Sequence, residues 1–210
     1  MTKEKSVIDY YVLCNKLKNV IRTGWKDWHV NKDRLESVAE HIYGVQMLAI
    51  AMKSEYQYDI NLERVIMMLA VHELGEITIG DLTQFQISKV EKEKIEHKAV
   101  HKILNGIVDG EKIEKLFLEF DERKTPEAKF AYQCDKLECD LQAKLYSEDN
   151  AVDLSMQEDN PTFFNSKVQK LLKKYHDWAK MWIKFGQETY PYDDNFRNVS
   201  EYAFKHKIKK

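Results

Sequence analysis

The sequence predicts an all-α fold, a helical bundle organised as one domain over residues 1–210. Glycine and proline, which interrupt helices, are scarce, with seven and three among 210 residues. The segments between them are long and rich in Leu, Lys, Glu, Ala and Met, which favour helices. Hydrophobic residues make up 43% of the chain, enough for a sizeable core, and no repeat or linker divides it.

The first predicted helix begins at a Ser6 cap and ends near Arg22. Its apolar residues recur at helical spacing: Val7, Tyr10, Tyr11, Cys14, Leu17, Val20 and Ile21. A loop with two tryptophans then leads to Ser37, which caps a second helix over residues 38–56. His41 lies beside the apolar face of that helix, one turn after the cap.

The third predicted helix begins at Asn61 and ends near Glu76, and a turn around Gly80 follows it. Residues 148–160 are polar and acidic, which is typical of a loop. The remaining predicted helices cover residues 88–106, 111–121, 125–147 and 161–186. The candidate functional residues fall within about residues 17–146, so we interpret the last of these helices as a C-terminal extension of the same domain.

The composition excludes several classes of protein. The formal charge is −2, from 33 basic and 35 acidic residues, so no nucleic-acid partner is predicted. The apolar runs are far shorter than the ~18 residues of a membrane span, and the N-terminus has no hydrophobic signal core. Three cysteines without a CxxC pair predict neither a disulfide framework nor a structural zinc site. We therefore expect a cytoplasmic protein with no membrane partner.

The stretch from residue 65 to 82, VIMMLAVHELGEITIGDL, is the strongest candidate for a functional site. It begins as an apolar run, which predicts a buried helix, and it then places His72, Glu73 and Glu76 within five residues. On a helix, His72 and Glu76 share a face, and Glu73 lies about 100° round from His72. An imidazole and two carboxylates at the end of a buried helix are costly unless a partner such as a divalent metal pairs with them.

Two further residues can join this group from other predicted helices. His41 belongs to the second helix, and Asp135 belongs to the helix over residues 125–147. Two histidines with carboxylates suit a divalent transition metal. No single spacing is specific, because an isolated histidine on a half-apolar helix is usually structural. The joint pattern carries the prediction.

Four segments of the chain give this pattern a family resemblance: IRTGW, RLESVAEH, AVHELGEITIGDL and CDKLECDLQA. In order and spacing, over about residues 17–146, they resemble the HD-domain metal-dependent phosphohydrolases, and most closely the bacterial 5'-deoxynucleotidase branch. The resemblance implies the HD-type helical fold and hydrolysis of a deoxynucleoside 5'-monophosphate to nucleoside and phosphate. It also implies a homodimer.

The resemblance implies a role for each matching residue. One divalent ion per chain (Mn, Co, Zn, Fe or Mg) is bound by His41, His72, Glu73 and Asp135. A bound metal lowers the pKa of water toward about 7 and neutralises phosphoryl charge. The other implied roles are positioning or deprotonation of the attacking water by Glu76, phosphate binding by Arg22, packing on sugar or base by Trp25, and a contribution to the site by Asp81.

Structural alternatives remain open for these four residues. Glu76 fits an exposed acid at a helix end, and Arg22 fits a residue that faces the C-terminal dipole of its helix. Trp25 fits the core, and Asp81 fits a turn cap beside Gly80.

The sequence departs from the family pattern at two places. The family dyad is His-Asp, whereas this chain has Glu73 after His72, and the extra methylene moves the carboxylate by about 1.5 Å. The family often has prolines and a lysine after the Gly-Asp pair, whereas residues 83–86 are Thr, Gln, Phe and Gln, in a loop expected to line the substrate site. Two alternatives follow: a degenerate module that binds a nucleotide or partner without turnover, or a hydrolase of nucleoside triphosphates or another phosphoester.

Overall fold

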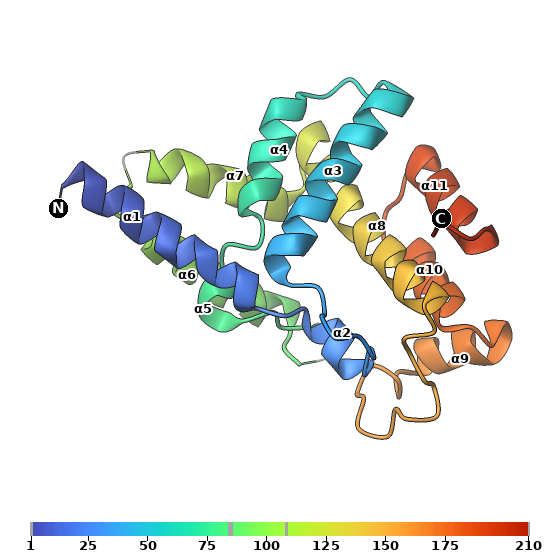
Figure 1. Cartoon of the computed structure of the whole chain (residues 1–210). Coiled ribbons are helices and arrows are strands. Elements are labelled where there is room, and N and C mark those ends of the chain that lie inside the picture. The colour runs from blue at the N-terminus through green and yellow to red at the C-terminus, as the bar shows by residue number, and fades with distance from the viewer. Residues whose placement is uncertain (1, 84–85, 108, 210) are drawn as a thin grey trace. The chain divides into compact units, whose positions relative to one another are not determined.

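The computed structural model describes residues 2–83, 86–107 and 109–209, and every regular element in this part of the chain is a helix (Figure 1). The predicted all-α fold is therefore confirmed. Gln84 and Phe85, predicted to line the substrate site, lie outside the described residues. The helices are α1 (Lys3–Cys14), the 3₁₀ helix η1 (Asn15–Asn19), α2 (Thr23–Asp27), α3 (Val38–Tyr56), α4 (Leu62–Val71), α5 (Glu76–Ile79), α6 (Lys89–Leu104), α7 (Gly110–Glu122), α8 (Pro126–Glu148), α9 (Ser166–Tyr175), α10 (Trp178–Thr189) and α11 (Asp194–Lys205).

The chain divides into two compact units. The first comprises Met1–Thr23 and Glu36–Tyr132, and the second comprises Gly24–Leu35 and Gln133–Lys210. The division falls inside α8, so it does not coincide with the end of the motif-bearing region predicted near residue 146. Among the described residues, no helix has the length and apolar character needed to cross a membrane.

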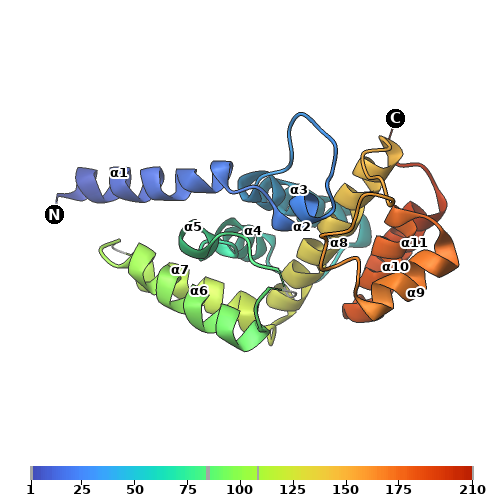
Figure 2. The same cartoon turned by 90° about the horizontal axis from the view of Figure 1, so that it is seen from below.

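The first unit is built on paired helices. Figures 1 and 2 both show α3 beside α4 and α6 beside α7. Between α4 and the α6–α7 pair lies a core of buried apolar side chains: Val71, Leu74, Val100, Ile103, Leu104 and Phe117. This core fixes the end of α4 and the turn after it against α6.

The first predicted helix is shorter than expected. α1 begins after a Thr2 cap, not at Ser6, and it ends at Cys14 instead of reaching Arg22. The chain then passes through η1 and becomes extended, because its backbone pairs with residues near the start of α3. The hydrogen bonds run from the Arg22 amide to the Glu36 carbonyl (3.0 Å) and from the Val38 amide to the Val20 carbonyl (2.8 Å). The alternative that placed Arg22 at a helix C-terminus is therefore wrong.

The start of α3 agrees with the sequence analysis. Ser37 accepts a hydrogen bond from the Glu40 amide, and the Glu40 carboxylate accepts one from the Ser37 amide at 2.9 Å. This reciprocal capping box satisfies two backbone donors that a helix start leaves without intrahelical partners. It fixes the first turn of α3, and His41 follows at a fully buried position.

The second unit contains a cluster of aromatic rings. Trp25, Trp28, Trp178 and Trp182 pack with centroid separations of 5.1–6.4 Å, mostly edge to face. The single helix predicted over residues 161–186 is wrong, because α9 ends before His176, which has a left-handed φ of 51°. Asp177 then caps α10 through the Lys180 amide.

Candidate metal centre

The predicted helix from Asn61 to Glu76 ends early, at Val71. Residues 72–75 form a tight turn in which the Leu74 and Glu76 amides bond carbonyls three residues back, at 3.0 and 3.1 Å. The imidazole Nδ1 of His72 lies 2.7 Å from the Leu69 carbonyl in the last turn of α4. His72 and Glu76 thus belong to two elements, although the sequence predicted one.

Three potential metal ligands converge in the first unit. Oε1 of Glu73 lies 3.8 Å from Nε2 of His41 and 3.6 Å from Nε2 of His72. All three atoms lie within 4.8 Å of one another. Two ligands on a tetrahedral ion with ~2.1 Å bonds are about 3.4 Å apart. The structure therefore places His41, His72 and Glu73 close together, at separations near those of a metal centre.

The tautomer of His72 suits this role. A carbonyl oxygen can only accept a hydrogen bond, so Nδ1 of His72 must carry the proton that it donates to Leu69. In a neutral imidazole, Nε2 then holds the lone pair, and Nε2 is the atom that faces Glu73. Metal-binding histidines commonly have their second nitrogen held in this way. Two imidazoles and a carboxylate arranged like this fit a divalent transition metal.

Arg22 and Asp81 form the second part of the site. The Arg22 guanidinium lies 3.5 Å from Oε1 of Glu73 and 3.8 Å from Oδ1 of Asp81. Asp81 is held by Thr23, whose amide donates to Oδ2 at 2.6 Å and whose hydroxyl donates to the Asp81 carbonyl at 2.5 Å. These bonds connect the start of α2 to the segment after α5, and Arg22, which directly precedes α2, lies beside the candidate ligands.

Glu76 is a buried acid, not the exposed helix-end residue of the structural alternative. It is 1% exposed, and burial, followed by the charges of Glu73 and Asp81, raises its pKa well above the ordinary value. Lys92 of α6 donates to its Oε1 at 3.3 Å. Its other oxygen, Oε2, is buried and has no hydrogen-bond partner among the described residues. A buried oxygen of high proton affinity suits a proton acceptor.

Asp135 and Trp25 belong to the second unit. Asp135 lies on α8, is 2% exposed, and forms an ion pair with Lys136 at 2.7 Å. Trp25 is buried against Tyr146 and Trp182, with centroid separations of 5.3 and 5.1 Å, which favours the core alternative. The structure thus brings together His41, His72, Glu73, Glu76, Arg22 and Asp81 within one unit. The roles of Asp135 and Trp25 stay predictions.

A family model described as an HD domain matches residues 14–179. The chain belongs to the HD-domain family. The match covers the candidate ligands on both units, so the predicted family is confirmed.

Named relatives of this HD-domain protein are eukaryotic. A Danio rerio protein named 5'-deoxynucleotidase HDDC2 is 30% identical over 190 residues, or 87% of this chain and 92% of the relative. A Schizosaccharomyces pombe protein named 5'-deoxynucleotidase hdd1 is 34% identical over 143 residues, or 65% of this chain and 70% of the relative. These relatives support the HD-domain assignment. They do not show that the chain belongs to the bacterial branch that the sequence motifs suggested.

Solved structures share the fold. A conserved hypothetical protein from Pyrococcus furiosus has a TM-score of 0.62 at 25% identity, with 95% of this chain and 99% of that chain covered. A protein from Magnetospirillum magnetotacticum described as a predicted metal-dependent phosphohydrolase has a TM-score of 0.58 at 17% identity, with 96% and 94% covered. The second likeness is evidence for the fold alone.

Sequence analysis missed two residues of this region. Lys92 and Glu96 lie on α6, and Lys92 contacts both Glu76 and Glu96. Glu96 is 9% exposed, and burial raises its pKa to about 7, although Lys92 opposes this rise. The only signal in the sequence is a Lys-Glu pair four residues apart, which is common on exposed helix faces.

Replacement of Glu96 by glutamine should change how stability depends on pH in the metal-free protein. A folded-state pKa near 7, against an ordinary value of 4.5, means that the native state retains a proton that the unfolded state releases. The wild type should therefore lose stability relative to Glu96→Gln as pH rises from about 4.5 to 7, by about 3 kcal/mol. Urea unfolding with a chelator present measures this, and Glu111→Gln, at an exposed position, is the control. A free-energy difference that stays constant with pH would contradict the assignment.

Proposed function

We propose that this HD-domain protein is a metal-dependent phosphohydrolase that cleaves a nucleotide phosphomonoester, with a deoxynucleoside 5'-monophosphate as its substrate. The observation that carries the proposal is the convergence of His41, His72 and Glu73 around one point of the first unit. The relatives named 5'-deoxynucleotidases supply the substrate class.

One divalent ion is held by His41, His72 and Glu73, with Asp135 as the fourth ligand. Family membership and the buried position of Asp135 on α8 support the inclusion of this aspartate. Such an ion acidifies water and neutralises the charge of a phosphoryl group. Phosphate monoester hydrolysis is among the slowest uncatalysed reactions, so both contributions are needed.

Glu76 accepts the proton of the attacking water. Its Oε2 is the available oxygen, because Lys92 binds Oε1. The water oxygen adds to phosphorus, the bond from phosphorus to the sugar oxygen breaks, and the leaving sugar oxygen takes up a proton, which balances the one that Glu76 accepted. Nucleoside and inorganic phosphate are released. The buried position of Glu76 supports this role, because burial gives the carboxylate a high affinity for the proton.

Arg22 binds the substrate phosphate. Its guanidinium lies 3.5 Å from Glu73 and 3.8 Å from Asp81, beside the candidate metal ligands, and a guanidinium can bind two phosphate oxygens at once. Asp81 positions Arg22 through its bonds to Thr23, and this is its contribution to the site.

The first test is phosphate release from a panel of deoxynucleotides by protein with Mn²⁺, Co²⁺, Mg²⁺ or Zn²⁺, combined with elemental analysis. We expect about one metal per chain and release of inorganic phosphate from deoxynucleoside monophosphates. Glu76→Ala should lower kcat at least about 100-fold, because the proton acceptor is lost, while the metal content stays unchanged. Retained turnover in Glu76→Ala would exclude its assigned role. Pyrophosphate or triphosphate as the product would indicate a nucleoside triphosphate hydrolase, and a metal-free, inactive protein would indicate a binding module.

Glu73→Asp should retain metal and activity. The aspartate keeps the negative charge and the oxygen ligands, and it restores the His-Asp dyad of the family. Glu73→Ala removes a ligand, so it should lower metal affinity about 10- to 100-fold or more. Isothermal titration calorimetry with the metal ion measures the metal affinity of both variants and of the wild type. Equal metal affinity in Glu73→Ala and the wild type would show that position 73 is not a ligand.

We also propose that the protein is a homodimer formed through α1. Four large apolar side chains of this helix are exposed: Val7, Ile8, Tyr11 and Val12. Not one α1 residue is fully buried, and a 12-residue helix is marginal without tertiary packing. A second copy would cover this face.

Light scattering should give twice the chain mass of 24.9 kDa. Tyr11→Lys should convert the protein to a monomer, because it places a charge in the apolar contact, while Tyr43→Lys on exposed α3 should leave the dimer intact. A monomeric wild type, or a Tyr11→Lys protein that stays dimeric, would contradict the interface.

A further inference from the structure

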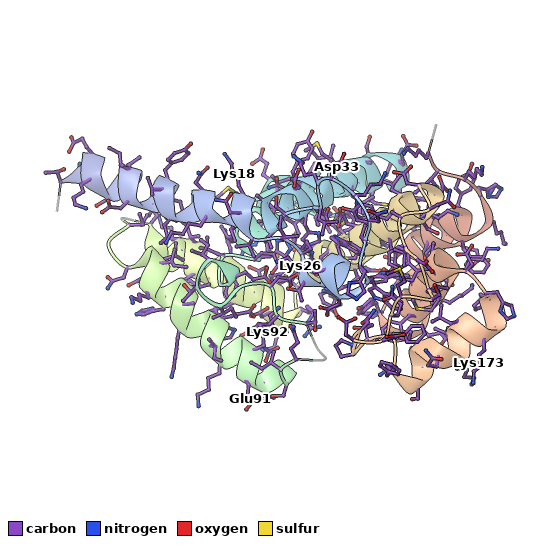
Figure 3. All side chains as sticks on the ribbon, turned by 60° about the horizontal axis from the view of Figure 1, so that its bottom comes forward. Lys18, Lys26, Asp33, Glu91, Lys92 and Lys173 are labelled. Carbon is purple, nitrogen blue, oxygen red and sulfur yellow. The ribbon has the colours of Figure 1, made fainter. Side chains whose placement is uncertain are left out.

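Lys92 connects α6 to the candidate site. Its ammonium group lies 3.3 Å from Oε1 of Glu76 and 3.5 Å from Oε1 of Glu96, and its side chain is 25% exposed. Figure 3 labels Lys92 and the adjacent Glu91, which lie on different sides of α6. Glu91 is exposed, whereas Lys92 extends toward buried carboxylates.

A glycine permits this contact. Gly75 directly precedes Glu76, and a Cβ atom at Gly75 would lie 3.0 Å from both Cβ and Cγ of Glu96. Such a distance is shorter than ordinary carbon contacts, so a larger residue would require Glu96 or its helix to shift by a few tenths of an ångström. The absence of a side chain at position 75 thus accommodates the close approach of Glu96 on α6 to the turn that carries Glu76.

Two cations contact four carboxylates of this region. Arg22 contacts Glu73 and Asp81, while Lys92 contacts Glu76 and Glu96. Lys92 is thus the cation that touches the proposed proton acceptor. Glu96, one helical turn after Lys92, holds the ammonium group from the other side.

We propose that Lys92 is a positioning residue that fixes the carboxylate of Glu76 through Oε1 and leaves Oε2 for the attacking water. This inference rests on the function proposed above. Its structural basis is that Oε1 of Glu76 accepts a hydrogen bond from Lys92, whereas the buried Oε2 has no such partner among the described residues. Glu96 and Gly75 serve the same purpose, because they orient the ammonium group and admit α6.

A lysine near a phosphate site could instead bind the substrate directly, and the kinetic constants separate these roles. A positioning residue affects the transition state, so its loss lowers kcat with little change in KM. A phosphate ligand contributes binding energy to the ground state, so its loss raises KM.

The kinetic experiment compares Lys92→Met, Lys92→Arg and the control Lys94→Met in the metal-loaded protein. Lys94 is exposed on the same helix, so its replacement makes the same chemical change away from Glu76. Lys92→Met should lower kcat about 10- to 100-fold, since a small misplacement of a reacting group has an effect of this size. KM should stay within about twofold. Lys92→Arg should recover most of the lost kcat, and Lys94→Met should match the wild type.

Three outcomes would overturn the inference. These are an unchanged kcat in Lys92→Met, a raised KM with kcat retained, and a Lys92→Arg protein no more active than Lys92→Met. If Lys92→Arg were no more active than Lys92→Met, the positive charge at position 92 would not be what positions Glu76.

A double-mutant cycle tests the contact without using turnover. Urea unfolding at pH 8 compares the wild type, Lys92→Met, Glu76→Gln and the double variant. Because the two side chains are in contact, we expect their effects on the unfolding equilibrium constant to be non-additive by about tenfold. Additive effects would overturn the inference even if the enzyme is active. A wild type that couples the two residues but hydrolyses no phosphoester would instead show that the proposed function has failed, and the positioning role with it.

Discussion

Burial of charge is the constraint on which the first unit depends. Glu76 and His41 are almost completely shielded from solvent, and Glu96 is nearly so. An isolated charge in such a place costs several kcal/mol, so each group needs a defined partner. Lys92 lies between two of the carboxylates, and Arg22 lies beside Glu73. The break between α4 and α5 belongs to the same arrangement, because the turn lets His72 bond the Leu69 carbonyl.

The glutamate at position 73 reaches both histidines from a tight turn. Judged from the sequence alone, the extra methylene displaces the ligand oxygen by about 1.5 Å and raises the possibility of a degenerate site. In the structure, Oε1 of Glu73 nevertheless faces Nε2 of both histidines at nearly equal distances. The side chain starts from a tight turn and not from a continuous helix. The longer side chain therefore still places a carboxylate oxygen beside both imidazoles.

The sequence predicted the parts of this site that depend on short-range order. His41 follows a capping box, and the apolar run before His72 identifies a buried helix, so both residues could be placed near the core, although the end of that helix at Val71 was not predicted. The early end of α1 could not, because the competing hydrogen bonds come from residues 36 and 38. The same limit applies to Trp25, whose aromatic neighbours Tyr146 and Trp182 are more than a hundred positions away.

Lys92 and Glu96 show most clearly why pattern alone was insufficient. A Lys-Glu pair four residues apart on an exposed helix contributes only about 0.3–0.5 kcal/mol, so it carries no functional signal. The pair becomes significant because α6 approaches the turn at Gly75 and removes Glu96 from solvent. Exposure, which decides the strength of a charge interaction, is a property of tertiary packing.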